Sequence, residues 1–101
     1  MSTKEDFKID EKVKIDVQPP KLWKVIFLND DTTPMELVID LLQGVFNHSL
    51  DSAKKITLEV HNTGSGVAGI YNLEIAEELS LQATRQARRN GSPLRIQVEE
   101  E

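Results

Sequence analysis

The segment Asn29-Asp30-Asp31-Thr32-Thr33-Pro34-Met35 has the greatest potential for chemistry in this 101-residue chain. An amide and two carboxylates stand together just before a predicted helix, where their oxygens could be presented to a cation. A structural interpretation is equally open, because Asn and Asp commonly end strands and Thr commonly caps helices. Physics alone does not choose between a binding loop and an ordinary turn.

His61 is the second candidate, one helical turn after Thr57 on an otherwise apolar face. A histidine in that position more often has a structural role than a ligating one. With Asp30 and Asp31 it could in principle hold a divalent metal, which would suggest a small metal-dependent hydrolase. Two acids and one histidine without a spacing signature are weak support for a metal, so we expect none.

Composition excludes several classes of function. The chain has no cysteine, which excludes disulfides, thiolate zinc sites and cysteine nucleophiles. Its net charge of −5 argues against nucleic-acid binding, and the basic residues at 85, 88 and 89 fit a helix C-terminus. The longest apolar run is Val25–Leu28, too short to cross a membrane, and the N-terminal residues lack a signal-peptide pattern. We therefore expect a cytoplasmic protein without a cofactor.

The chain divides into a tail and one core domain. Residues 1–20 are rich in Lys, Asp and Glu and end in Pro19-Pro20, which predicts a flexible N-terminal tail before a core at residues 21–101. The β-branched and aromatic run at 21–28 predicts a first strand. Residues 67–71 and 94–98 predict two more.

Three helices are predicted between these strands. Thr33, Pro34 and Glu36 match a capping box that starts a helix ending near 47–48. Ser49 caps a second helix, which ends at residues 62–64. Asn72 caps a third, whose predicted buried stripe consists of Ile75, Leu79, Ala83 and Ala87. The order β-α-α-β-α-β indicates an α+β fold, a small antiparallel three-stranded sheet with three helices packed on it.

A resemblance adds to this interpretation. The stretch Lys24–Val38, which contains Asn-Asp-Asp-x-Thr-Pro-Met, resembles the signature of the ClpS family. The likeness continues at Val60-His61, at 66–71 and 75–77, and ends at Ser92-Pro93-Leu94. ClpS is the adaptor that delivers N-degron substrates to the Clp protease. The resemblance therefore implies recognition without catalysis.

The resemblance also implies a site. By matching positions, Asn29, Asp30 and His61 would hold the substrate's free α-amino group. An apolar first side chain, typically Leu, Phe, Tyr or Trp, would enter a pocket lined by Asp31, Thr33, Met35, Val38, Thr57, Val60 and Leu94. This is chemically coherent, because a buried ammonium is costly unless its three donors are paired.

The implied partner is the N-terminal domain of a ClpA-like unfoldase working with ClpP, with the adaptor expected as a monomer. The resemblance implies that Glu74 and Leu79 lie on the surface that contacts the unfoldase. Glu74 is retained there, but Leu79 stands where the family commonly has Lys. Thr57 likewise stands where the family commonly has Met. A ribosomal-stalk-like interaction domain is the alternative, because its fold is similar.

Overall fold

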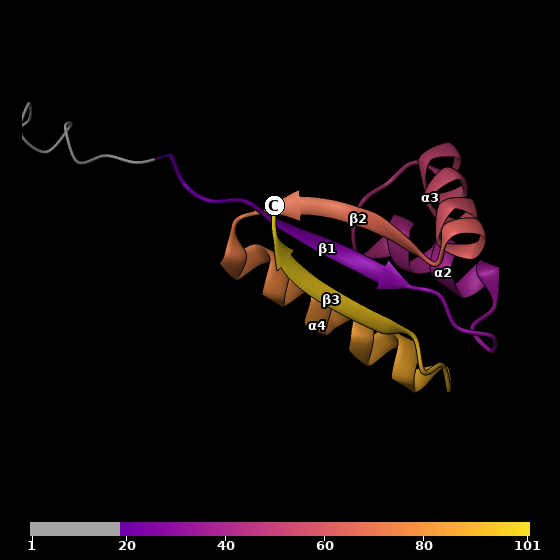
Figure 1. The fold of residues 1–101 in the computed structure, drawn as a ribbon. Helices are drawn as coiled ribbons and strands as arrows, with labels where there is room; N and C mark the ends of the chain where they lie inside the picture. Colours follow the sequence, from indigo (N-terminus) through magenta and orange to yellow (C-terminus); the bar gives the residue numbers. More distant parts are fainter. Residues whose placement is uncertain (1–18) are drawn as a thin grey trace, which may run out of the picture.

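A computed structural model describes residues 19–101 and contains six elements. In chain order they are β1 (Trp23–Leu28), α2 (Met35–Gly44), α3 (Leu50–Thr63), β2 (Ser65–Tyr71), α4 (Leu73–Arg89) and β3 (Arg95–Glu100). The order β-α-α-β-α-β confirms the predicted α+β fold (Figure 1). Apart from Pro19 and Pro20, the predicted tail lies outside the described residues.

The sheet has β1 at its centre, with β2 on one side and β3 on the other, and both pairings are antiparallel. Val25 and Phe27 on β1 are fully buried, and Ile26 between them is half-buried. This alternation arises because successive side chains of a strand point to opposite faces. The buried face of β1 thus provides the centre of the core.

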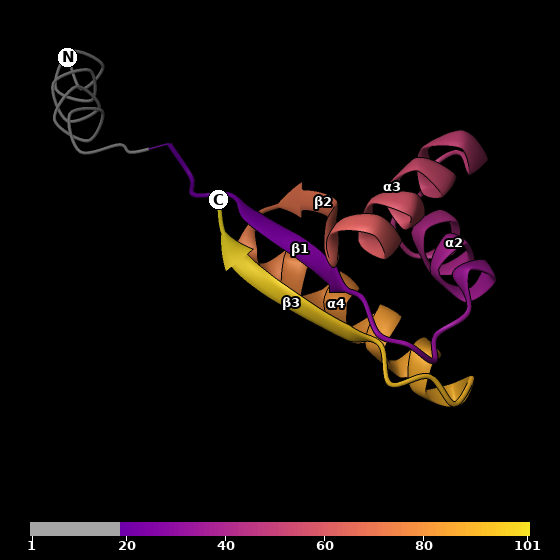
Figure 2. The ribbon, with the colours of Figure 1, turned by 45° about the vertical axis from the view of Figure 1, so that its right-hand side comes forward.

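The helices divide the sheet between them. α4 contacts all three strands, α3 packs against β2, and α2 contacts both α3 and α4 (Figures 1 and 2). The two shorter helices gather at the end of the sheet where β1 finishes. Their apolar side chains complete the core, together with those of the sheet and α4: Val25, Phe27, Val38, Leu41, Leu42, Phe46, Ala53, Val60, Ala68, Ala76, Ala83, Ala87 and Leu94.

Most of the predicted helix boundaries are confirmed. The Ser49 hydroxyl accepts from the Ser52 N–H at 3.1 Å, and the Asn72 side chain accepts from the Ile75 N–H at 2.9 Å. Gly64 ends α3 with a φ of 97°, a left-handed conformation that glycine adopts without strain. These caps depend on nearest neighbours, which is why the sequence predicts them well.

Several predicted details are wrong. The capping box does not form: α2 begins at Met35, and its N-cap, Pro34, offers no side-chain acceptor. The same helix ends at Gly44 instead of near 47–48. On α4, Ile75 is 48% exposed and Ala76 is buried in its place, because the buried stripe is shifted by one residue at the start of the helix. β2 starts two residues earlier than predicted, and β3 runs two residues further.

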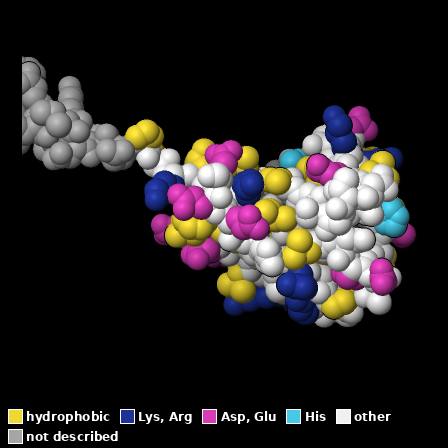
Figure 3. All heavy atoms as spheres, viewed as in Figure 1, with side chains coloured by type: hydrophobic (Ala, Val, Ile, Leu, Met, Phe, Trp, Pro, Cys, Tyr) yellow, Lys and Arg dark blue, Asp and Glu magenta, His cyan; other side chains and the backbone are white. Residues whose placement is uncertain are grey.

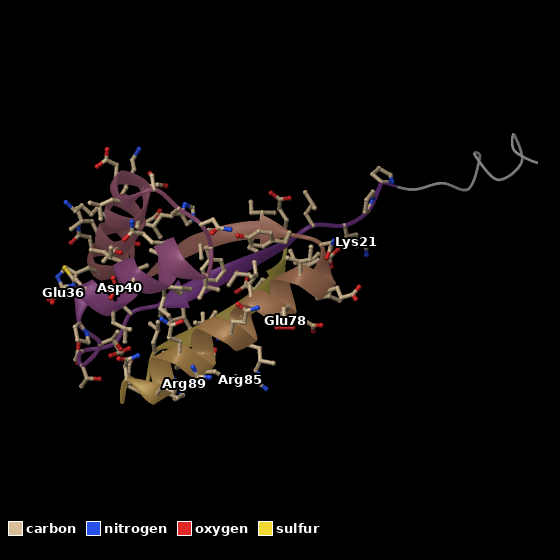
Figure 4. All side chains as sticks on the ribbon, turned by 180° about the vertical axis from the view of Figure 1, so that it is seen from behind. Lys21, Glu36, Asp40, Glu78, Arg85 and Arg89 are labelled. Atoms are coloured by element: carbon tan, nitrogen blue, oxygen red, sulfur yellow. The ribbon has the colours of Figure 1, made fainter. Side chains whose placement is uncertain are left out.

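Charges of both signs are mixed over the surface. Acidic, basic and apolar side chains alternate across the face in Figure 3. Glu78 lies on the first half of α4 and Arg85 and Arg89 on the second (Figure 4). Glu74 in the first turn and Arg88 and Arg89 in the last complement the helix dipole, as predicted. Among residues 19–101, no helix combines the length and apolar character needed to cross a bilayer.

Candidate functional site

A cavity of about 200 Å³ opens between the loop after β1, helices α2 and α3, and the residues that precede β3. That volume suits one amino-acid side chain better than a drug-sized ligand. The structure brings ten residues together around it, and they are the ten that the sequence resemblance implies. The lining consists of Asn29, Asp30, Asp31, Thr33, Met35, Val38, Thr57, Val60, His61 and Leu94. Their placement is observed, and their roles in binding stay a prediction.

Asp30 organises the loop on one side of the cavity. Its Oδ1 accepts from the backbone N–H groups of Thr32 at 2.8 Å and Thr33 at 2.7 Å, and from the Thr32 hydroxyl at 3.0 Å. Its Oδ2 accepts from the Thr33 hydroxyl at 2.7 Å. Thr33 is therefore a donor to Asp30 and not a helix cap. The turn is held by a carboxylate, as Asp side chains commonly do.

These hydrogen bonds also set the charge state of Asp30. Partial burial raises the pKa of the carboxyl group, but the hydrogen bonds from Thr33 and Thr32 outweigh burial and hold the pKa below its ordinary value. The group is therefore ionised throughout the neutral and mildly acidic range. An anionic acceptor stands at the cavity before any ligand arrives.

Asn29 and His61 reach the cavity from two elements that the fold holds together. The Asn29 backbone N–H donates to the Gly64 carbonyl at 2.9 Å, which ties the end of β1 to the end of α3. His61 lies in the last turn of α3 and is exposed. The cavity therefore combines an amide, a carboxylate and an imidazole, and each can accept a hydrogen bond.

The rest of the cavity is largely apolar. Val38, Val60 and Leu94 are buried, and Met35 is exposed. Thr57 is only 3% exposed, and its hydroxyl donates to the Ala53 carbonyl one turn earlier at 2.7 Å. The hydroxyl of Thr57 is thus satisfied within its own helix, as such side chains often are.

Ser92 was missed by the sequence analysis. It is 4% exposed, and its Oγ lies 2.6 Å from the Thr33 Oγ1 and accepts from the Leu94 N–H at 3.1 Å. Arg88 donates to the carbonyls of Ser92 and Leu94 at 2.9 and 2.8 Å. The sequence pattern indicated only a helix end here, because a contact across 59 residues leaves no local signal.

The structure gives no support to the hydrolase alternative. Within residues 19–101, no group of three or more His, Asp and Glu side chains is arranged to hold a metal ion. Asp30, Asp31 and His61 line one cavity, but they do not form such a group. What these side chains offer to a ligand is a set of hydrogen-bond acceptors.

Glu74 and Leu79 lie apart from the cavity, on the first half of α4. This helix has 17 residues and is about 25 Å long, and it ends near Ser92 at the cavity. Glu74 is exposed, whereas Leu79 is half-buried against the core. Two shallow hollows surround Glu74, lined by Asn72, Leu73, Ile75, Glu77 and Glu78. The surface around Glu74 is both acidic and apolar.

The comparisons with known proteins decide the family. The family model described as "ATP-dependent Clp protease adaptor protein ClpS" matches residues 18–97. The chain belongs to the ClpS family. ClpS is a family of adaptors and not of enzymes. The match therefore favours the ClpS interpretation over the ribosomal-stalk alternative.

Individual ClpS proteins agree with this assignment. The ATP-dependent Clp protease adapter protein ClpS of Sodalis glossinidius is 46% identical over 90 residues, which cover 89% of this chain and 85% of that protein. ClpS of Wolinella succinogenes is 42% identical over 95 residues, covering 94% and 93%. A solved structure of Agrobacterium tumefaciens ClpS2 bound to L-phenylalaninamide has a TM-score of 0.79 and 38% identity, over 82% of this chain and all of that one.

Proposed function

We propose that this ClpS protein binds the free α-amino group and the bulky first side chain of N-degron substrates, those beginning with Leu, Phe, Tyr or Trp. It then delivers them to a ClpA-type AAA+ unfoldase for degradation by ClpP. The observation that carries the proposal is a single cavity, of the size of one side chain, that combines three polar acceptors with an apolar lining. Only the N-terminal residue of a chain carries a free α-ammonium beside its side chain.

The acceptors fit an ammonium in number and type. An α-ammonium has three donors and no acceptor, and leaving any donor unpaired in a desolvated site is costly. Asn29, Asp30 and His61 would supply an amide oxygen, a carboxylate oxygen and an imidazole nitrogen. Asp30 adds the negative charge that compensates the cation.

The ligand of the related structure supports the same chemistry. L-phenylalaninamide, bound by the Agrobacterium ClpS2, has a free α-amino group, an aromatic side chain and an amide in place of a carboxylate. It therefore has the features of the first residue of a peptide that begins with Phe. A ligand of this kind would place its ring among Val38, Val60 and Leu94 in our protein.

The unfoldase would dock on the first half of α4. Glu74 stands there among exposed Leu73 and Ile75, so the surface offers both charge and apolar contact. The surface is separated from the cavity by much of the length of α4. Substrate and unfoldase could then be bound at the same time. Leu79, half-buried against the core, would contribute less than an exposed residue at that position.

Fluorescence anisotropy with peptides that differ only in their first residue tests the proposal. Peptides starting with Leu, Phe, Tyr or Trp should bind, because each buries an apolar side chain in the cavity. Peptides starting with Ser or Asp should bind far more weakly. Equal affinity across the series would contradict a site that recognises the first side chain.

Thr57 is expected to widen the range of first residues. Its side chain is shorter than the Met that the family commonly has, so the cavity wall should recede on this side. In a Thr57→Met variant, the ratio of Leu-peptide to Ile-peptide affinity should rise about tenfold, because one or two methylenes in a pocket change selectivity by about 1–3 kcal/mol. Anisotropy titrations of both peptides against both proteins measure the ratio. An unchanged ratio would show that another residue excludes β-branched side chains.

Binding should weaken at alkaline pH. The α-amine of the peptide loses its proton near about pH 8, and with it the positive charge and one donor that the site would recognise. The lowered pKa of Asp30 keeps this carboxylate charged across the neutral and alkaline range, so the decline would come from the peptide and not from Asp30.

Anisotropy titrations from about pH 7 to 9 measure this decline, with circular dichroism to verify the fold. An affinity that stayed constant across this range would show that the charge of the α-amine is not recognised.

A further inference from the structure

We propose that Ser92 is a positioning residue for substrate recognition: through Thr33 it holds the Asp30 carboxylate in the orientation that receives the substrate's α-amine. The inference rests on the proposed function and adds a residue to it. Ser92 lies in the loop between α4 and β3, opposite the loop that contains Asp30. Its hydroxyl connects these two loops across the sequence.

The hydrogen bonds of this connection run in one direction. A carboxylate can only accept, so the Thr33 hydroxyl donates its single proton to the Asp30 Oδ2 at 2.7 Å. The contact of 2.6 Å between Thr33 Oγ1 and Ser92 Oγ must then have Ser92 as the donor. Ser92 in turn accepts from the Leu94 N–H. The relay therefore runs from Leu94 through Ser92 and Thr33 to Asp30.

The start of the relay is rigid. Arg88 binds the carbonyls of both Ser92 and Leu94, so the backbone on either side of Pro93 is fixed to α4. Ser92 itself is almost fully buried. Hydrogen bonds in such surroundings are electrostatically stronger than in water, and consecutive ones polarise each other. The backbone position that Arg88 fixes thus sets the position of the Ser92 hydroxyl, and through Thr33 that of the Asp30 carboxylate.

The end of the relay leaves a specific atom for the ligand. Asp30 Oδ1 accepts from three donors of Thr32 and Thr33, whereas Oδ2 accepts only from the Thr33 hydroxyl. A carboxylate oxygen has two lone pairs, so Oδ2 retains one. The relay holds the Thr33 hydroxyl on one lone pair of Oδ2. This sets the direction in which the second, free lone pair of Oδ2 can accept from the substrate's α-amine. Leu94, at the start of the relay, lines the same cavity.

Ser92→Ala tests the inference, with Thr63→Val as the control. Both variants remove one hydroxyl that makes hydrogen bonds, but the Thr63 hydroxyl donates to the backbone of Glu59 and Ser65 and takes no part in the network of Asp30. Ser92→Ala should weaken binding of a Leu-starting peptide about tenfold, and Thr63→Val should change it less than about twofold. Ser92→Thr, which keeps the hydroxyl, should restore most of the affinity.

A double-mutant cycle separates positioning from a general structural role. Asp30→Asn replaces one carboxylate oxygen with a donor, so the relay can no longer end on the carboxylate. In that background, Ser92→Ala should change peptide affinity less than about twofold if it acts through Asp30. A loss in the Asp30→Asn background equal to that in wild type would overturn the inference, because it would show that Ser92 acts independently of Asp30.

The remaining outcomes are also decisive. If Ser92→Ala does not fold, Thr33→Val breaks the same relay while leaving the bond between Ser92 and Leu94, and the same tenfold loss and the same cycle apply. Wild-type affinity in Ser92→Ala, or in Thr33→Val where that variant replaces it, would overturn the inference alone. If the wild-type protein did not bind the Leu-starting peptide, the proposed function would fail, and this inference with it.

Discussion

Acetylating the N-terminus of a Leu- or Phe-starting peptide is expected to weaken its binding severely. Acetylation removes the positive charge and two of the three donors of the α-amine, and leaves the acceptors of Asn29, Asp30 and His61 facing a neutral amide. Losing one partner of a desolvated charged contact typically costs about 2–5 kcal/mol, which weakens affinity by about 30-fold or more. Fluorescence anisotropy with the free and acetylated forms of one labelled peptide measures the difference.

A matched control separates the terminus from overall charge. The same peptide with one internal Lys side chain acetylated loses an equal charge but keeps its α-amine. That peptide should bind nearly as well as the unmodified one, because an internal side chain does not reach the three acceptors. If the N-acetylated and free peptides bound equally, the cavity would not recognise the terminus. It could then recognise at most the apolar side chain.

The fold was largely predictable because its boundaries depend on local chemistry. Ser49 and Asn72 cap helices through contacts three residues away, and Gly64 ends α3 through its own backbone freedom. Such signals are complete within a few residues of sequence. Thr33 shows the limit of this reasoning. It has the right neighbours for a cap, but Asp30 and Ser92 engage its hydroxyl and the helix starts later.

The site was less predictable from physical reasoning alone. Asn29, Asp30 and Asp31 looked equally like the end of a strand, and His61 looked like an ordinary residue of a helix face. The resemblance to ClpS selected the binding interpretation, and the structure then placed all ten implied residues around one cavity. Ser92 lies where the resemblance ends, but neither the residue pattern nor the resemblance gave it a role. Its contact with Thr33 exists only once the two loops are folded against each other.

Asp30→Ala is expected to have the largest effect of any single substitution. The change removes the charged acceptor for the α-amine, and it also removes every hydrogen bond that shapes the loop between Asp30 and Thr33. A Leu-starting peptide should lose about 30-fold or more in affinity. The affinity of Asp30→Asn for this peptide should lie between those of wild type and Asp30→Ala. Its amide oxygen can still accept from the backbone of the turn, but the negative charge is lost.

Anisotropy titrations of the three proteins, with Asp40→Ala as a charge control, test this order. Asp40 is exposed on α2 and does not line the cavity, so its loss should leave affinity within about twofold of wild type.

The difference between wild type and Asp30→Asn should also depend on pH. Because the folded pKa of Asp30 is depressed, the stability its charge provides is present above the ordinary value of 3.8 and is lost as the pH falls through the folded value. The difference in melting temperature between wild type and Asp30→Asn should therefore shrink in strong acid. A difference that persisted there would mean that the loop is held by contacts other than the ionised carboxylate, and the affinity loss could not then be assigned to its charge.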